Sequence, residues 1–308
     1  MSKTILVTGA TSGIGRHAAL HLAKLGHRVF ATGRNGAQLA LLADEAKGLA
    51  LETIELDVTS ARSIAAAHAE VDRRTDGRGL DVLINNAGYG LWAPLELVTD
   101  EDLRKQFDTN VFGLMAVTRA FLPAMRARGD GRVLNVSSVG GRITLPFGGA
   151  YNATKYALES MSDALRLELA PFGVRVVLIE PGLIRTDFAA RTMGLLSKYR
   201  EEPSAYTPVI EKAAKMERQM DALSVGPEHV SRAIARAVEA RRPSARYVAP
   251  WRTYAMLAFM KAMPTSFVDW VLRRASGITR AALLASPKSA PASDRPPPSS
   301  AERPHATA

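Results

Sequence analysis

The stretch Lys3-Thr-Ile-Leu-Val7-Thr8-Gly9-Ala10-Thr11-Ser12-Gly13-Ile14-Gly15 lies at the start of the sequence and decides the fold. Residues 3–7 form a β-branched run, and an amphipathic helical pattern follows as far as Leu25. Glycines let the backbone turn tightly and approach a pyrophosphate, whose charge is favoured by the unpaired N–H groups at a helix start. The spacing G-x-x-x-G-x-G departs from G-x-G-x-x-G, and a glycine-rich turn alone is often a plain loop. Its position between a first strand and a first helix nevertheless predicts nucleotide binding.

The second predicted strand, residues 27–32, ends at Gly33-Arg34. In dinucleotide-binding folds an acidic residue near this point bonds the ribose hydroxyls, whereas an arginine accommodates a 2′-phosphate. Ala31, Thr32 and Gly33 are not acidic, and Arg34 is basic. We therefore predict NADP(H) in preference to NAD(H). The alternative is an Arg34 that simply faces solvent.

Strand and helix patterns alternate over the first 180 residues, which is typical of a parallel sheet covered by helices on both faces. The further strands are predicted at 51–57, 80–85, 132–137, 174–180 and 245–249. The further helices are predicted at 35–47, 60–74, 99–128, 151–172 and 227–242.

The segment Tyr151-Asn-Ala-Thr-Lys155 begins the helix predicted at 151–172. A spacing of four places the phenol and the ammonium on one helix face. A neighbouring cation favours the phenolate, which would let Tyr151 exchange a proton near neutral pH as a general acid/base. Many tyrosines at helix starts merely pack, but a second polar group supports the chemical reading. Ser138 lies thirteen residues upstream, directly after the strand 132–137, where the carboxyl end of a parallel strand would expose it.

Asn110 lies in the middle of the helix predicted at 99–128. An internal asparagine lowers helix propensity, so the side chain either faces water or is needed for its amide. The helical pattern alone favours the water-facing position.

Composition restricts the class of protein. The 308 residues are 47% hydrophobic, enough for a full α/β core, and we favour one domain with a tail over two domains. There are no cysteines, which excludes disulfides and cysteine-based metal sites. The net charge of +10 is spread over dispersed arginines without a basic-aromatic ladder, so we predict no nucleic-acid partner. His17 and His21 share a helix face but have no evident third ligand, so we predict no metal.

The N-terminus enters a strand at once, which leaves no room for a signal peptide. No apolar run approaches the roughly 18 residues that a membrane span needs, because Lys261 and Asp269 interrupt the best candidate. We therefore predict a cytoplasmic protein, with peripheral membrane contact left open.

Five motifs together resemble the short-chain dehydrogenase/reductase family, over about residues 3–250. They are Thr8-Gly9-x-x-x-Gly13-x-Gly15, Asn85-Asn86-Ala87-Gly88, Ser138, Tyr151-x-x-x-Lys155 and Pro181-Gly182. The resemblance implies a Rossmann-type doubly wound parallel sheet with helices on both faces, and an oxidoreductase that interconverts a carbonyl and an alcohol. Residues 1–250 would form the nucleotide-binding and catalytic domain. Within it 183–225, broken by Pro203 and Pro208, would be a substrate loop or lid.

The resemblance also implies roles for single residues. Tyr151 would be the acid/base, Lys155 would lower its pKa and hold the nicotinamide ribose, and Ser138 would bond the substrate oxygen. The thirteen-residue gap selects Ser138 over Ser137. Asn110 would hold a water that connects Lys155 to solvent, which reverses the reading from the helical pattern.

Further implied contacts concern the cofactor. Asp57 and Val58 would contact the adenine, Asn86 the inner ribose region, and Thr186 the carboxamide. The complete predicted cofactor set is Gly9, Thr11, Ser12, Gly13, Ile14, Gly15, Arg34, Asp57, Val58, Asn86, Ala87, Gly88, Tyr151, Lys155, Pro181, Gly182 and Thr186.

Residues 251–285 form a predicted amphipathic helical extension, and 286–308, rich in Pro, Ser and Ala, are predicted to be disordered. The extension mixes large apolar side chains with Arg252, Lys261, Arg273, Arg274 and Arg280 against a single acid, Asp269. Two readings stay open. The helices either lie on anionic lipid or cap the pocket or a dimer interface, and the second reading is favoured.

Similar extensions occur in family members that resemble hydroxysteroid and retinol dehydrogenases. By this analogy the preferred substrate is a bulky lipophilic alcohol or ketone. The alternatives are a reductase of acyl or small carbonyl substrates, a non-catalytic NADP-binding sensor, and a peripheral membrane protein that only binds. In relatives, the helices at 99–128 and 151–172 commonly form a four-helix homodimer contact, although Leu158, Met161 and Leu165 could equally be buried on the sheet.

Overall fold

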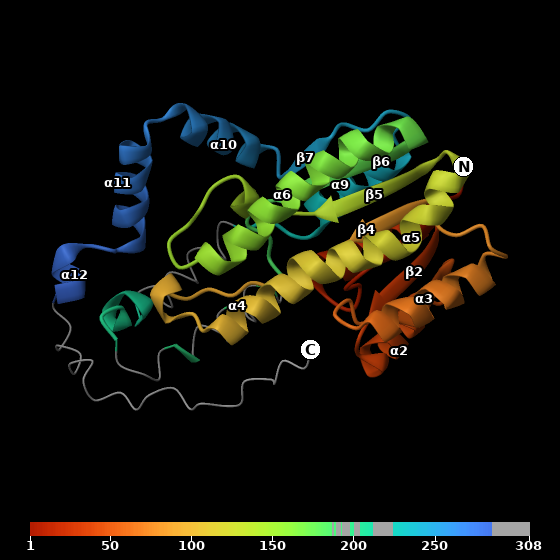
Figure 1. Ribbon diagram of the computed structural model, residues 1–308, viewed down its shortest axis with the longest axis horizontal. Coiled ribbons are helices and arrows are strands. Elements are labelled where there is room, and N and C mark those ends of the chain that lie inside the picture. Colours follow the sequence, from red (N-terminus) through yellow and green to blue (C-terminus); the bar gives the residue numbers. More distant parts are fainter. Residues whose placement is uncertain (187, 189–191, 193–197, 200–203, 212–223, 285–308) are drawn as a thin grey trace, which may run out of the picture.

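A seven-stranded, fully parallel sheet forms the centre of the protein, with strand order β3-β2-β1-β4-β5-β6-β7 (Figure 1). The computed structural model describes all residues except 187, 189–191, 193–197, 200–203, 212–223 and 285–308. The strands are β1 (Thr4–Val7), β2 (Arg28–Gly33), β3 (Leu51–Glu55), β4 (Val82–Asn85), β5 (Gly131–Val136), β6 (Val174–Pro181) and β7 (Arg246–Ala249). The predicted doubly wound fold is confirmed.

The direction of the strand order reverses at β1, which pairs with both β2 and β4. Leu6 lies opposite Phe30 on one side and Leu83 on the other, and all three side chains are completely buried. Such strands are apolar on both faces because helices cover both faces. Ligands of open α/β sheets bind outside the carboxyl ends of the strands at this kind of reversal, so the fold places the site beyond Val7 and Asn85.

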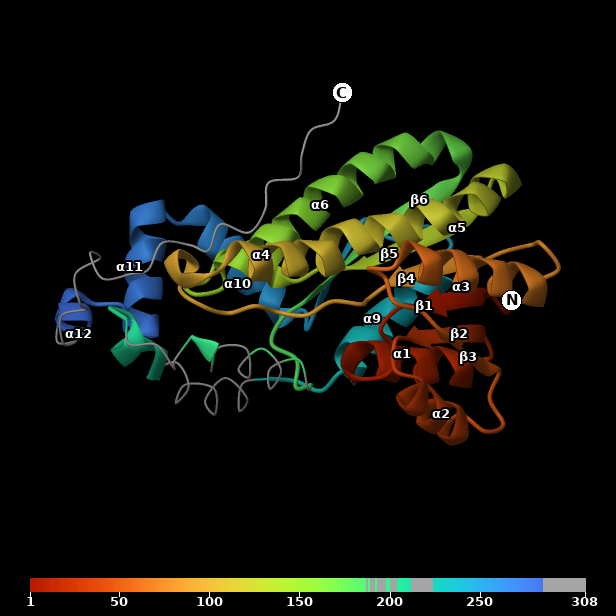
Figure 2. The same cartoon turned by 60° about the horizontal axis from the view of Figure 1, so that its bottom comes forward.

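Helices cover the two faces of the sheet in two groups (Figure 2). One apolar core joins the sheet to α1 (Gly13–Lys24), α2 (Gly36–Glu45) and α9 (Glu228–Glu239). The other joins it to α3 (Ala61–Arg74), α5 (Leu114–Arg128) and α6 (Gly149–Leu169). Short 3-10 turns occur at η1 (Leu95–Leu97), η3 (Val139–Gly141) and η4 (Ala170–Phe172).

The helix predicted at 99–128 is interrupted. It consists of α4 (Asp100–Phe107), a π-helical segment η2 (Asp108–Gly113) and α5. The wider turn brings Gly113 against the main chain of Val58, where a Cβ would lie 2.6 Å from the Val58 carbonyl oxygen. Helix propensity cannot predict the π-helical segment, because the Val58 main chain that Gly113 contacts belongs to a distant part of the sequence.

The chain beyond β7 continues as α10 (Arg252–Ala262), α11 (Thr265–Ser276) and α12 (Arg280–Leu284). Figure 1 shows these helices leading away from the sheet. The helical character of the extension is therefore confirmed. The tail predicted to be disordered lies outside the described residues, and so does much of the loop 183–225.

Candidate active site

The glycine-rich turn between β1 and α1 adopts a conformation that requires glycine. Gly9 and Gly13 have φ angles of +64° and +55°. A Cβ on Gly15 would lie 2.4 Å from both the Gly9 oxygen and the Asn86 Nδ2 atom. Ser12 is the N-cap of α1, so the first N–H groups of this helix, those of Gly13, Ile14 and Gly15, face the turn. The turn therefore has the backbone geometry that an anion cradle needs, and its role in binding a phosphate stays a prediction.

The ends of β1 and β4 are joined through Thr8 and Asn86. The Asn86 side chain donates to the carbonyls of Thr8 (2.9 Å) and Gly9 (3.2 Å), and the Thr8 hydroxyl accepts from the N–H groups of Asn86 and Ala87 (2.9 and 3.0 Å). The Asn86 amide, expected at the ribose, is thus engaged in holding the glycine-rich turn in shape.

The end of β2 carries Arg34, whose side chain is exposed. Thr11 lies beside it, with its Cγ2 atom 2.6 Å from the Cβ position of Gly33. The Asp57 carboxylate accepts from the N–H and the hydroxyl of Thr59 (2.9 and 2.7 Å), which lowers the Asp57 pKa, and the charge of Arg34 contributes. Arg34 forms no ion pair with the part of the chain that the structure describes, so its guanidinium is available to a ligand.

Ser138, Tyr151 and Lys155 come together beyond the end of β5. The Ser138 hydroxyl is hydrogen-bonded to the Tyr151 phenol and accepts from the Gly140 N–H at 3.0 Å. Tyr151 and Lys155 are both buried. The Lys155 Nζ atom donates to the Val136 carbonyl at 2.9 Å and lies 5.7 Å from the centre of the Tyr151 ring.

Burial dominates the electrostatics of this pair. It raises the pKa of Tyr151 to about 12, partly offset by the Ser138 hydrogen bond, and it lowers the pKa of Lys155 to about 8. The expected downward shift of the Tyr151 pKa is therefore wrong for this structure. The ammonium turns toward Val136, while burial penalises the charged form of each group.

Asn110 is completely enclosed, so the water-facing reading is wrong. Its amide donates to the Tyr89 carbonyl (2.9 Å) and to the Thr154 hydroxyl (3.1 Å), and its oxygen accepts from the Tyr89 N–H (3.1 Å). The Gly88 Cβ position lies 3.0 Å from this oxygen. Asn110 therefore clamps the loop after β4 to α6, between Tyr151 and Lys155. The water contact implied by the family stays a prediction.

The remaining predicted residues lie around the same edge. Thr186 lies beside Gly13, with 3.4 Å between its Cβ and the Gly13 Cβ position. Gly182 donates to the Ala249 carbonyl at 2.8 Å, directly after Pro181 at the end of β6. The start of α10 covers this point, because the Thr253 hydroxyl lies 2.7 Å from the Gly182 Cβ position.

Sequence reasoning missed two neighbours of Tyr151. The Phe188 ring lies 5.6 Å from the Tyr151 ring and against Gly90. Asn152 donates to the carbonyls of Gly140 (2.7 Å) and Ile143 (3.2 Å), which fixes the Ser138 loop to α6. Asn152 was visible as a polar residue next to Tyr151, whereas nothing in the sequence brings Phe188 to this point.

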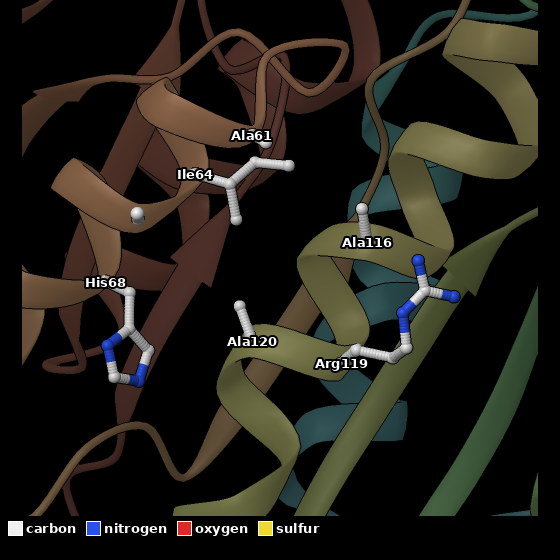
Figure 3. A pocket seen from close by; sticks show the side chains of 7 residues that line it. Ala61, Ile64, His68, Ala116, Arg119 and Ala120 are labelled. Atoms are coloured by element: carbon white, nitrogen blue, oxygen red, sulfur yellow. The ribbon is translucent and has the colours of Figure 1, made fainter. Parts of the chain in front are cut away.

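A groove of about 390 Å³ lies elsewhere, between α3 and α5 (Figure 3). It is lined by Ala61, Ile64, Ala65, His68, Ala116, Arg119 and Ala120. None of the predicted site residues borders it, so we place the site at the strand ends.

His17 and His21 lie on one face of α1 with 6.3 Å between their ring centres. The His17 Nδ1 atom is hydrogen-bonded to the Ser231 hydroxyl at 2.7 Å, which ties α1 to α9. Within the described residues, no three His, Asp or Glu side chains are grouped as metal ligands would be. His17 thus has a structural partner.

The fold and these motifs define the class of protein. Residues 3–193 match the family described as short chain dehydrogenase, and the chain belongs to this family. It is therefore an oxidoreductase that acts on CH–OH groups.

Two curated relatives and one solved structure show the range of similar proteins. The chain is 38% identical to human 17-beta-hydroxysteroid dehydrogenase type 1 over 80% of this chain and 77% of that protein. It is 37% identical to human retinol dehydrogenase 16 over 88% of this chain and 87% of that protein. It is also similar to a closed form of serine dehydrogenase complexed with NADP+, with a TM-score of 0.69, 31% identity and coverage of 80% of this chain and 93% of that chain.

Proposed function

We propose that this protein is an NADP(H)-dependent oxidoreductase that interconverts a carbonyl and an alcohol, with Tyr151 as the general acid/base. The observation that carries the proposal is the buried Tyr151 phenol, hydrogen-bonded to Ser138 and one helical turn from Lys155. It lies at the same sheet edge as the glycine-rich turn. The experiment is NADPH-dependent turnover of carbonyl compounds by the wild type and by Tyr151→Phe.

The nucleotide would supply a hydride to the carbonyl carbon, and the chain has to orient the reactants and provide a proton. Tyr151, with its pKa raised to about 12, is protonated at neutral pH and so carries the proton that the reduced carbonyl oxygen would accept. The Ser138 hydroxyl would bond the substrate oxygen beside it, and the Lys155 cation would stabilise the phenolate that remains. The cradle of Gly9, Gly13 and Gly15 would hold the pyrophosphate.

Arg34 supports the choice of NADP(H), because its exposed guanidinium has no ion-pair partner among the described residues. We expect Arg34→Ala to raise the KM for NADPH by about ten- to a hundredfold, since a charge-assisted hydrogen bond contributes about 1.5–3 kcal/mol. The KM for NADH should stay unchanged. Arg119→Ala, which removes an exposed arginine of α5, is the matched control. An equal rise for both nucleotides, or no rise, would contradict the 2′-phosphate contact.

A bulky lipophilic substrate of the steroid, retinoid or lipid type is the preferred class. Similarity to proteins named for hydroxysteroids and retinol supports it, and Phe188 provides an apolar wall beside Tyr151. A reductase of small or acyl carbonyls is the alternative, in keeping with the similarity to serine dehydrogenase. A non-catalytic sensor is less well supported, because sensors of this fold tend to lose the tyrosine or the lysine.

We assign residues 1–250 to the nucleotide-binding and catalytic domain, with 183–225 as the substrate loop, and 251–285 to the extension.

Within the described residues, no helix is long and apolar enough to cross a membrane. Yet several large apolar side chains of the extension are exposed, among them Trp251 (76%) and Trp270 (57%), whereas Leu257 is buried. Arg274 stacks on Trp270 with 5.6 Å from its guanidinium carbon to the ring centre. This observation favours peripheral contact with anionic lipid.

We expect the protein to co-sediment with phosphatidylserine vesicles at low salt, and less with phosphatidylcholine vesicles. The double variant Phe267→Ala/Trp270→Ala should lose most of this binding, whereas Leu167→Ala, which removes an exposed apolar side chain of α6, should keep it. Absence of sedimentation with the anionic vesicles would refute lipid contact.

Light scattering on the same variants tests the homodimer. On α6, Leu158 is buried, Met161 and Leu165 are partly covered, and Leu167 is exposed. A dimer that Leu167→Ala weakens would place the contact on α6. A dimer that only the Phe267→Ala/Trp270→Ala variant weakens would instead place it on the extension.

A further inference from the structure

A network of charged side chains lies directly behind Lys155. Lys155, Glu159 and Asp163 follow one another at a spacing of four on α6, which puts them on one helix face. Glu159 is only 7% exposed, and its Oε2 atom accepts from the Arg246 guanidinium at 3.3 Å. Arg246 reaches this point from β7 and also bonds Asp163 at 2.6 Å. The Glu159 carboxylate is thus held one turn from Lys155.

The second layer of the network balances its charge. Glu180 on β6 is completely buried and lies 3.1 Å from the Arg246 Nε atom. Arg142, four residues after Ser138, bonds both Glu180 oxygens at 3.0 and 3.2 Å. Buried carboxylates remain charged only when cations and hydrogen bonds compensate for lost solvation. Two arginines from separate elements supply this compensation beside Glu159 and Glu180.

We propose that Glu159 is a positioning residue of the reaction, whose carboxylate keeps the Lys155 ammonium charged at the site. This inference rests on the proposed function, in which the Lys155 cation holds the nucleotide ribose and stabilises the Tyr151 phenolate. Arg246 acts one step further back, because it favours the charged form of Glu159. Packing alone does not explain why an acid is buried at position 159. An effect of its carboxylate on the Lys155 charge does.

The directions of the pKa shifts of Lys155 and Glu159 agree with this role. Burial lowers the pKa of Lys155 to about 8, and the charge of Glu159 acts in the opposite direction. Burial also raises the pKa of Glu159, with Glu180 adding to the rise and Arg246 opposing it. The charged groups that surround Glu159 are therefore Lys155 and Asp163 on its own helix, Glu180 on β6, Arg246 on β7, and Arg142. Without the Glu159 charge, Lys155 would lose its proton at a lower pH.

The test is the pH dependence of kcat/KM and of NADPH affinity in three variants. The Lys155 charge is lost as pH rises through its pKa, so a lower pKa moves the alkaline limb of both profiles to lower pH. We expect a shift of about one pH unit in Glu159→Gln and a smaller shift of the same sign in Glu159→Asp. Glu168→Gln removes an exposed acid of the same helix that takes no part in this network, and it should leave the limb in place.

The inference would be overturned if the alkaline limb of Glu159→Gln coincided with that of the wild type. It would also be overturned if kcat/KM fell by the same factor at every pH. Thermal unfolding of each variant shows whether it is folded. If Glu159→Gln does not fold, the alkaline limb of Glu159→Asp tests the inference instead. A limb at lower pH than that of the wild type supports it, and an unchanged limb refutes it. A wild type that binds NADPH without any turnover would refute the proposed function alone, because the pH profile of NADPH affinity still tests Glu159.

Discussion

Replacing Tyr151 by phenylalanine is expected to lower kcat by about 10²- to 10⁴-fold, the usual contribution of a positioned general acid/base. The substitution removes only the phenolic oxygen, which is hydrogen-bonded to Ser138, while the ring keeps its contact with Phe188. NADPH affinity should stay close to the wild-type value. The measurement is steady-state turnover of NADPH with a carbonyl substrate, together with NADPH binding by fluorescence.

Tyr156→Phe is the matched control, because Tyr156 lies on the same helix with an exposed side chain. It should leave both kcat and NADPH affinity unchanged. Turnover that persists in Tyr151→Phe would refute the acid/base assignment. A loss of NADPH affinity as large as the loss of kcat would instead indicate that the phenol mainly shapes the nucleotide site.

Gly15→Ala is expected to abolish most NADPH binding, with a loss of tenfold or more in affinity. A Cβ there would lie 2.4 Å from the Gly9 oxygen, which is part of the same turn. The turn must open to relieve this contact, and overpacking of this kind costs about 1–3 kcal/mol. Thermal unfolding and a fluorescence titration with NADPH measure the two effects.

Gly36→Ala provides the comparison for this effect. Gly36 begins α2, and a Cβ there would meet no atom within 4 Å. We expect it to bind NADPH and unfold as the wild type does. Equal affinity in Gly15→Ala and the wild type would show that the turn is not the phosphate cradle.

Local sequence patterns were sufficient to predict the strands of the sheet and most helices, because β-branched runs indicate strands and amphipathic periods indicate helices. The spacing of the motifs was also sufficient to predict that Ser138, Tyr151 and Lys155 lie together at one edge of the sheet. The position of Asn110 could not be derived from its helix, since its partners Tyr89 and Thr154 belong to other elements. The upward shift of the Tyr151 pKa follows from burial of the phenol, which the spacing of residues in the sequence does not report.

Long-range contacts explain what else was missed. Glu159 follows Lys155 by one turn, but its partner Arg246 is 87 residues away in the sequence. Phe188 belongs to the loop 183–225, whose irregular composition gives no register toward Tyr151. Such contacts follow from the arrangement of β6, β7 and the loop around α6, so they appear only in three dimensions.

Transfer of deuterium from NADPH doubly deuterated at the nicotinamide C4 position tests the central claim most directly. The wild type would be incubated with steroid ketones, retinal and small carbonyl compounds, and the alcohol products analysed by mass spectrometry. We predict an alcohol that carries one deuterium on the former carbonyl carbon, formed from a bulky lipophilic substrate and absent with Tyr151→Phe. Tight NADPH binding without a deuterated product from any of these compounds would contradict the proposed hydride transfer.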